Sequence, residues 1–242
     1  MSSFKKKIVI TGGSGRFGQI FKKNSKNFEF SFFFPKKNKL NILQISTIKK
    51  YLKYLKPNYL IHLAGLSRPM KIHEQDIIQS IDKNIIGTAN ITKVCSELNI
   101  KLIYISTCYV YPGIKGNYNE DSPLLPINNY AWSKLGGECS VQLYKNSLIL
   151  RASVTEKPFI HEKAFADFKT NFIFHDDLIS IIIKLLDCKG IINIGGKSQS
   201  VYNFAKKYNS KIKKISAKNV LGKNARLNVS MDLNKLKKTI ND

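Results

Sequence analysis

One pair of side chains in the sequence could transfer a proton to a substrate oxygen. Tyr130 and Lys134 are four residues apart, so on a helix the phenol and the ammonium lie on one face, one turn apart. A nearby cation favours the phenolate and lowers the pKa of a tyrosine from about 10, which suits general acid–base chemistry near neutral pH. We therefore predict that Tyr130 transfers the proton and that Lys134 tunes its pKa.

The Y-x-x-x-K spacing occurs three times, so the spacing alone does not select this pair. A proline and a glycine interrupt the copy that begins at Tyr111, which therefore cannot be helical. The copy that begins at Tyr202 follows no strand end that carries hydroxyl groups, and an exposed helix face explains it. Only Tyr130 follows such a strand end, 23 residues after Thr107.

A glycine-rich turn near the start of the chain predicts a dinucleotide site. Gly13 and Gly15 lie between an apolar strand expected at 8–11 and a helix expected at 16–24, and Gly18 lies in the first turn of that helix. In this fingerprint the first glycine permits the tight turn, the second lets a pyrophosphate approach the backbone, and the third lets the helix pack against the strand. The phosphates would meet the positive end of the helix dipole. The cofactor contacts assigned here are Gly12, Gly13, Gly15, Arg16, Phe17 and Gly18.

The second strand is expected at 28–34. The charges of the residues that follow it indicate whether the site binds NAD or NADP. An acid about 20 residues after the glycines would hold the ribose 2′-hydroxyl of NAD, whereas a cation accommodates the 2′-phosphate of NADP. Lys36 and Lys37 stand there without an acid, so we predict NADP rather than NAD. The end of the strand expected at 59–64 also leaves room for a ligand. The cofactor contacts assigned there are Leu63, Ala64 and Gly65.

Strands and helices alternate along the chain, which predicts an α/β fold with a doubly wound parallel sheet of the Rossmann type. Further helices are expected at 46–55, 82–99 and 130–144, and a further strand is expected at 102–106. With 242 residues, the chain is long enough for one such domain with a full core. We expect an NADP-binding core over 1–154 and a small, shortened C-terminal substrate lobe over 155–242, of which 174–196 returns to the core sheet.

The net charge of +24 is the first property to test against nucleic-acid binding. Only four of the basic residues are arginines, and the lysines are spread through every surface segment and not gathered in one stripe. A solvated lysine coat explains this pattern, so we expect no nucleic-acid partner. The four cysteines are widely spaced, with no histidine pair near them, and we expect reduced thiols and no metal site.

The hydropathy pattern predicts a cytoplasmic protein with no membrane association. No stretch of about 18 apolar residues occurs in the sequence. The charged start of the chain leads directly into the first expected strand, without the apolar segment of a signal peptide.

With these residues assigned, the sequence resembles the extended short-chain dehydrogenase/reductase family, in the superfamily of NAD-dependent epimerases and dehydratases. It looks most like the dTDP-4-dehydrorhamnose reductase branch, and the matching segments follow the family order over nearly the whole chain. They are Thr11 to Gly18, His62 to Gly65, Asn84 to Asn90, Ser106 to Tyr111, Tyr118 to Pro126, Tyr130 to Glu138, Leu150-Arg151, His175 to Leu178, Asn193 to Gly196 and Met231 to Leu236.

The resemblance implies an NADPH-dependent reduction of a nucleotide-activated 4-keto-6-deoxy sugar in deoxysugar or polysaccharide synthesis. It implies that Tyr130 protonates the developing alkoxide, that Lys134 also holds the nicotinamide ribose, and that Thr107 donates a hydrogen bond to the substrate carbonyl. Relatives pair through the helices corresponding to 82–99 and 130–144, so the resemblance also implies a homodimer.

Several further residues are candidates for substrate contact. The guanidinium fork of an arginine fits a diphosphate, and Arg151 and Arg226 are two of the four arginines; a structural ion pair is the alternative for each. The substrate contacts assigned are Thr107, Cys108, Tyr109, Arg151 and Arg226.

Two departures from the family pattern leave the substrate open. Cys108 and Ala131 stand where the branch usually carries Asp and Gly, and only 23 residues separate Arg151 from His175, where the family has a longer insert. Two other functions stay as alternatives. One is a nucleotide-sugar epimerase or dehydratase that holds NAD tightly, and the other is a non-catalytic regulatory subunit that binds NADP.

Overall fold

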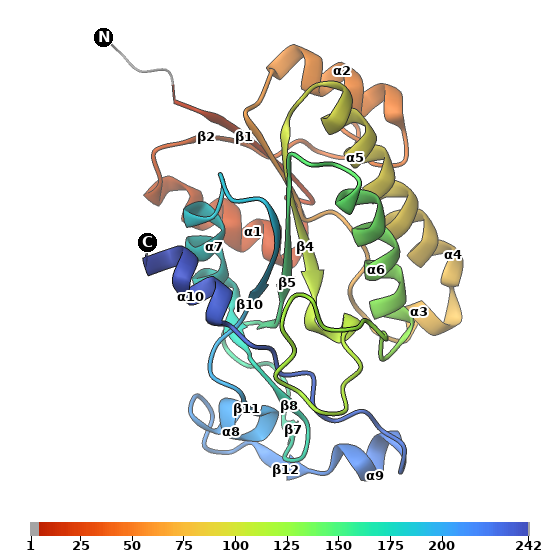
Figure 1. The fold of residues 1–242 in the computed structure, drawn as a ribbon, viewed down its shortest axis with the longest axis vertical. Helices are drawn as coiled ribbons and strands as arrows, with labels where there is room; N and C mark the ends of the chain where they lie inside the picture. Colours follow the sequence, from red (N-terminus) through yellow and green to blue (C-terminus); the bar gives the residue numbers. More distant parts are fainter. Residues whose placement is uncertain (1–4, 242) are drawn as a thin grey trace.

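A computed structural model describes residues 5–241 of the chain (Figure 1). Six parallel strands form the central sheet. They are β1 (Lys7–Thr11), β2 (Ser31–Phe33), β3 (Tyr59–His62), β4 (Lys101–Thr107), β5 (Ser147–Ala152) and β10 (Gly190–Ile194). Their order in space is β10-β5-β4-β3-β1-β2. The winding therefore reverses between β1 and β3, and open α/β sheets bind ligands at the carboxyl ends of strands beside such a point.

Continuous apolar runs explain why the central strands are buried. β4 and β5 read KLIYIST and SLILRA, and every residue of β5 is buried. Aliphatic side chains on both faces are typical of parallel strands that helices cover on both sides. The register pairs Thr107 with Ala152 and Thr11 with His62. The strand ends that carry the expected site residues therefore lie along one edge of the sheet.

Two layers of helices cover the two faces of this sheet, as Figure 1 shows. One layer contains α1 (Arg16–Asn24), α7 (His175–Lys184) and α10 (Asn234–Asn241). The other contains α2 (Ile45–Leu55), α5 (Gly87–Glu97) and α6 (Asn129–Gln142). Each layer closes its own apolar cluster against the strands. The first cluster includes Phe21, Ile182 and Leu236, and the second includes Leu52, Val94 and Val141.

The prediction of a single helix at 82–99 is wrong at the start of that helix. Two short helices, α3 (Ile72–Gln75) and α4 (Ile77–Ser80), lead into a π-helical turn, η2 (Ile81–Ile86), and only then does α5 begin. The buried Asn84 amide in η2 donates to the Leu66 carbonyl and to the Ser133 hydroxyl, each at 2.8 Å. This turn serves a tertiary contact, which an apolar period cannot reveal.

The strand expected at 28–34 is also shorter than its apolar pattern. Ser25–Asn27 forms a 3₁₀ turn, and only Ser31–Phe33 pairs with β1. The rings of Phe28 and Phe30 lie 6.5 and 6.1 Å from that of Phe32, centre to centre. The apolar residues before the strand therefore contribute to an aromatic cluster and not to the sheet.

The later part of the chain builds a small lobe beyond the carboxyl ends of the strands (Figure 1). Paired strands in it are β6 (Val154–Thr155) with β9 (Ile173–Phe174), β7 (Lys163–Phe165) with β12 (Lys213–Ile215), and β8 (Lys169–Thr170) with β11 (Gln199–Ser200). Its helices are α8 (Val201–Lys206) and α9 (Ala217–Leu221). A third apolar cluster lies within it and includes Phe168, Val201 and Val229.

The expected division of the chain at residue 154 stays a prediction. Both α7 and β10 fall within 174–196 and lie with the sheet. The helix α10 requires a correction, since it falls within the expected lobe but its Leu236 packs into the cluster beside the sheet. The apolar face of α10 consists of two residues, Leu236 and Ile240, and suits either partner, so the sequence does not decide between them.

Candidate active site

Tyr130 and Thr107 meet at the carboxyl end of β4. Tyr130 lies in the first turn of α6, and the side chain of Asn128 caps this helix by accepting the Ala131 N–H at 2.8 Å. Thr107 ends β4, is buried, and accepts the Tyr109 N–H with its hydroxyl at 3.3 Å. The interaction of the Thr107 hydroxyl with the phenol lowers the pKa of Tyr130. Strand and helix therefore bring together two of the three expected catalytic groups.

The net shift in the pKa of Tyr130 corrects the expectation from the sequence. Burial, and after it the Cys108 thiol, raise the pKa of Tyr130 to about 12, although Thr107 and Arg68 act in the opposite direction. Lys134 is not among the groups that shift this pKa, and its Nζ lies 4.1 Å from the centre of the Tyr104 ring. Desolvation therefore outweighs the nearby charge, and the phenol stays protonated at neutral pH.

Burial acts on Lys134 in the opposite sense. It lowers the pKa of Lys134 to about 7, while the carboxylate of Glu138, one turn further along α6, raises it. Burial, and after it the charge of Lys134, lowers the pKa of His62 to about 3. His62 is hydrogen-bonded to the hydroxyls of Thr11 at 2.7 Å and Thr88 at 3.1 Å. His62 is therefore a neutral core histidine whose two nitrogens are both bonded.

The glycine turn has the expected close contacts, but the tight turn falls one residue earlier than expected. Gly12, not Gly13, has a positive φ of 72°, and a Cβ there would lie 2.6 Å from the backbone nitrogen of Ala64. A Cβ on Gly18 would overlap the carbonyl oxygen of Gly12. The Ala64 N–H donates to the Thr11 hydroxyl at 3.1 Å. The structure therefore brings the glycine turn and the segment 63–65 together.

The helix that follows the glycine turn suits an anion. α1 begins at Arg16, and its first turn contains no acidic residue. The ring of Phe17 stacks on that of His175, with centres 4.7 Å apart. Lys36 and Lys37 are exposed in the loop after β2. This loop lies near the turn, because a Cβ on Gly13 would lie 3.0 Å from Phe34.

Arg151 is not available to a substrate, which corrects its assignment as a substrate contact. Its guanidinium is buried and donates to Oε1 of Glu138 from Nε at 3.0 Å and from Nη2 at 2.6 Å. Nη1 donates to the Tyr111 hydroxyl at 3.0 Å and to the Glu120 carbonyl at 2.9 Å. The second carboxylate oxygen of Glu138 accepts the Ser106 hydroxyl at 2.6 Å. The structural ion pair is therefore the correct alternative.

Arg226 also makes structural bonds. Its Nη1 donates to the carbonyl oxygens of Leu125 at 2.9 Å and Pro126 at 3.2 Å. It fastens the loop before α6 to the C-terminal part of the chain. Only Nη1 makes these bonds, so a contact between Arg226 and a substrate stays a prediction.

Cys108 and Tyr109 line the same strand end as Thr107. Cys108 is buried, and burial raises the pKa of its thiol to about 11. Its Sγ lies 3.8 Å from the hydroxyl oxygen of Thr170, in the lobe. The half-buried ring of Tyr109 meets that of Phe168 edge to face, with centres 6.2 Å apart. Both side chains therefore face the lobe cluster, and the cysteine is a neutral thiol.

Sequence reasoning missed three residues that surround Tyr130. His73 is buried in α3, and its ring centre lies 5.1 Å from that of Tyr130. Asn84 ties the loop after β3 to α6, and Arg68 in that loop is paired with Glu156 at 3.3 Å. His73 and Arg68 belong to short, irregular segments, where no periodicity points to a site. Only Asn84 lay within a segment that matched the family pattern.

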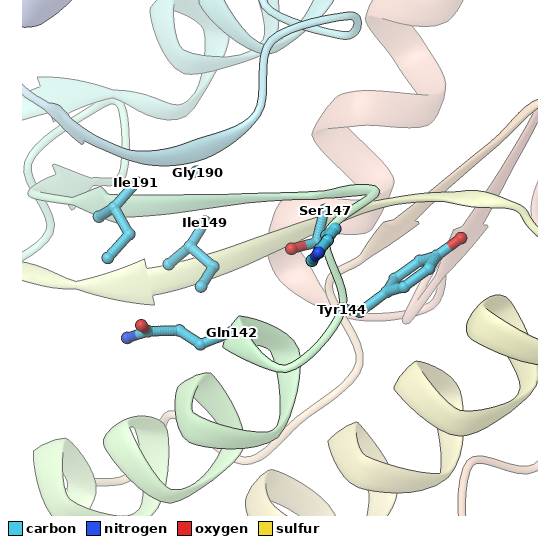
Figure 2. Close-up of a pocket in the computed structure, with 7 residues that line it drawn as sticks. Gln142, Tyr144, Ser147, Ile149, Gly190 and Ile191 are labelled. Atoms are coloured by element: carbon cyan, nitrogen blue, oxygen red, sulfur yellow. The ribbon is translucent and has the colours of Figure 1, made fainter.

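Two pockets lie away from these residues. One, of about 120 Å³, is at the amino ends of β5 and β10, where Gln142, Ser147 and Ile191 line it (Figure 2). The other, of about 710 Å³, is in the lobe, where Lys169, Lys197 and the start of α8 line it. Since Thr107 lies at the carboxyl end of β4, the pocket in Figure 2 is at the opposite end of the sheet.

Two further properties concern the part of the chain that the structure describes. Within residues 5–241, no group of three His, Cys, Asp or Glu side chains could hold a metal ion. None of the helices in this range combines the length and the apolar character that a bilayer crossing requires.

Comparison with known proteins identifies the family. The family model described as the RmlD substrate binding domain matches residues 6–169. The chain belongs to this family. The resemblance inferred from the motifs is thereby confirmed. Methionine adenosyltransferase 2 subunit beta of Xenopus laevis is 32% identical over 157 residues, which is 62% of this chain and 47% of that protein. The chain thus spans about half the length of the curated relatives it matches.

Solved structures of the same fold include proteins in complex with NADP or with NAD. A dTDP-4-dehydrorhamnose reductase from Bacillus anthracis, in complex with NADP, has a TM-score of 0.86 at 23% identity and covers 98% of this chain and 93% of its own. The enzyme WbmG of Bordetella bronchiseptica, in complex with NAD and UDP, has a TM-score of 0.75 at 18% identity, with coverages of 98% and 89%. These likenesses confirm the Rossmann α/β fold.

The buried ion pair generates a first prediction, about stability. Arg151→Met leaves the Glu138 carboxylate buried without its partner, so we expect a loss of about 3–5 kcal/mol in the free energy of unfolding. Adding Glu138→Gln removes the uncompensated charge and should recover at least about 1 kcal/mol. Urea unfolding followed by circular dichroism measures both values.

The control for this prediction is Arg226→Met, the same substitution at a half-exposed arginine that, within residues 5–241, bonds only to carbonyl groups. It should cost about 1 kcal/mol per bond or less. If the effects of Arg151→Met and Glu138→Gln simply add, within about 0.5 kcal/mol, the two side chains are not a coupled pair.

Proposed function

We propose that the protein is an NADPH-dependent oxidoreductase of the short-chain dehydrogenase/reductase type. Its substrate is a nucleotide-activated 4-keto-6-deoxy sugar, whose keto group it reduces. The observation that carries this proposal is the meeting of the Thr107 hydroxyl and the Tyr130 phenol at the carboxyl end of β4, two strands from the glycine turn on β1. Membership of the RmlD substrate binding domain family supports the same substrate class.

The roles of the three side chains follow from their environments. When bound, NADPH supplies the hydride to the keto carbon. Tyr130 gives its proton to the oxygen of that carbonyl, and a phenol whose pKa is about 12 is in the protonated form that this step needs. Thr107 donates a hydrogen bond to the same oxygen as negative charge develops on it. Lys134, whose pKa is about 7, binds the ribose hydroxyls of the nicotinamide half in its charged form.

The choice of NADP rests on charge and on one relative. Lys36 and Lys37 follow β2 at the position where a 2′-phosphate is accommodated, and the Bacillus anthracis reductase is in complex with NADP. WbmG, which is less similar, is in complex with NAD. The lobe over 155–233 would cover the sugar, and α10 then belongs to the NADP-binding core. A cytoplasmic location and a place in deoxysugar or polysaccharide synthesis stay predictions from the sequence.

A second candidate function has a specific observation in its favour. The curated relative with 32% identity is named as a subunit of methionine adenosyltransferase, so a non-catalytic subunit that keeps the fold is the alternative. Both candidates predict dinucleotide binding, whereas only the reductase predicts turnover. An epimerase or dehydratase would retain NAD and show no net change in its oxidation state during turnover.

The substitution Tyr130→Phe tests the catalytic assignment. Without the hydroxyl, the alkoxide receives no proton from the protein, and we expect kcat to fall by roughly 10²–10⁴. The loss of NADPH absorbance is followed with dTDP-4-keto-6-deoxy sugars, and NADPH affinity serves as the control because it should change little. Turnover that persists in the variant would refute the role of Tyr130. Dinucleotide binding without turnover by the wild type would favour the subunit.

The pKa of Lys134 predicts how cofactor affinity depends on pH. A lysine with a pKa of about 7 loses its charge between pH 6 and pH 9, so we expect the Kd for NADPH to rise roughly tenfold over this range. Fluorescence titration measures it. In Lys134→Arg the charge persists at all these pH values, and the profile should be flat. A profile identical in both proteins would assign the pH dependence to another group.

We also propose a homodimer. Exposed apolar side chains gather on α4, η2 and α6, which pack against one another. They include Ile78, Ile81 and Trp132, which are 67%, 43% and 52% exposed. Leu143, which is 87% exposed, lies just past the end of α6. An apolar face shared by neighbouring helices is typical of an interface between subunits.

The substitution Ile78→Lys tests the dimer. A lysine in the middle of this face would have to be desolvated on association, so the variant should be monomeric at concentrations where the wild type is dimeric. Light scattering coupled to size exclusion measures the mass. Tyr54→Lys is the matched control, since Tyr54 is also exposed but lies on α2. A wild type that is monomeric at high concentration would rule the dimer out.

A further inference from the structure

Glu156 connects the glycine turn to the loop after β3 through two ion pairs. Its Oε1 lies 3.1 Å from Nη1 of Arg16, and its Oε2 lies 3.3 Å from Nη1 of Arg68. Arg16 is the first residue of α1, whereas Arg68 follows β3. Glu156 follows β6, in the shortened stretch between β5 and α7. Three segments that are far apart in the sequence therefore meet at one carboxylate.

The two guanidinium groups are well suited to a different anion. An arginine fork binds phosphate oxygens with the same geometry as carboxylate oxygens. The side chains of Arg16 and Arg68 are 54% and 33% exposed, so both remain accessible from solvent. Arg16 also lies at the positive end of α1, where negative charge is favoured. A diphosphate that approaches the glycine turn therefore meets Glu156 as a competitor.

A diphosphate can interact more favourably with Arg16 and Arg68 than the carboxylate of Glu156 does, so it can replace that carboxylate. Ion pairs that are partly exposed contribute little to stability because water and salt screen them. Within residues 5–241, the side chain of Glu156 accepts hydrogen bonds only from Arg16 and Arg68. A diphosphate brings more negative charge and more acceptor oxygens to the same arginines, and the glycine turn adds backbone N–H groups.

We propose that Glu156 is an internal latch that competes with a diphosphate for Arg16 and Arg68. The inference rests on the proposed function, because it takes the glycine turn as the dinucleotide site. Binding of the diphosphate replaces the carboxylate on Arg16 and releases residues 156–162 from the glycine turn. The cofactor thereby controls the position of a segment that leads into the substrate lobe. We assign the diphosphate to the dinucleotide, because Arg16 directly follows the glycine turn.

The substitution Glu156→Gln tests the latch. Glutamine keeps the shape of the side chain but removes the charge that competes for the arginines, so we expect the Kd for NADPH to fall about fivefold in calorimetric titrations. The matched control is Glu162→Gln, which removes the same charge from an exposed glutamate in the same segment that makes no ion pair among the described residues. Its Kd should change less than about twofold.

A second ligand and a second readout separate the outcomes. Tighter binding of dTDP alone would place the diphosphate of a nucleotide sugar on the arginines and overturn the assignment to the cofactor. Hydrogen exchange of residues 156–162 should increase when NADPH binds the wild type, and unchanged exchange would contradict the release of this segment. An equal or higher Kd for NADPH in Glu156→Gln would show that the carboxylate is a brace. If neither protein binds NADPH, the proposed function fails together with the latch.

Discussion

The buried ion pair between Glu138 and Arg151 fixes the helix that carries Tyr130 relative to the sheet. Glu138 is fully buried on α6, and its partner Arg151 is buried on β5. The Ser106 hydroxyl on β4 donates a hydrogen bond to the second oxygen of the Glu138 carboxylate. Beyond Arg151, the hydroxyl of Tyr111 donates to Asn193 on β10 at 2.7 Å. A charge pair in this position costs desolvation free energy, and it is tolerable only because its lone pairs and protons are bonded. These bonds fix the position of α6 along the sheet. Because Tyr130 lies two turns before Glu138 on the same helix, they also fix the position of Tyr130.

The same burial sets the protonation of the two groups that we propose for chemistry. Removing water disfavours whichever form is charged, so it raises the pKa of Tyr130 and lowers that of Lys134. At neutral pH this gives a protonated phenol beside a lysine that is close to its own pKa. A reduction needs an acid at the carbonyl oxygen, and the neutral phenol is that acid. In the proposed reduction, the neutral phenol of Tyr130 is therefore in the form that can give a proton to the carbonyl oxygen.

The sequence predicts those features that depend on local spacing. The helix at 16–24 and the alternation of strands and helices that builds a parallel sheet follow from glycine positions and apolar runs, and the structure confirms these elements. Prediction from the sequence fails where a residue distant along the chain determines the conformation or the contacts of a side chain. Spacing does not reveal the partner of Arg151, because Glu138 is 13 residues away along the chain, and it does not reveal the π-helical turn, which places the Asn84 side chain against Leu66 and Ser133. The direction of the Lys134 side chain is likewise a property of packing and not of spacing.

The shortened stretch between β5 and α7 still performs the structural tasks of a longer insert. Backbone bonds from Ser153 to Ile194 and from Ile173 to Ser153 tie its two ends to the end of β10. Its middle provides β7, which pairs with β12 and so anchors the lobe. Cys108 and Tyr109, which follow β4, contribute to the apolar cluster of the lobe. If the substrate is the sugar that we propose, these side chains and the segment that Glu156 couples to the glycine turn are the groups at hand to select it.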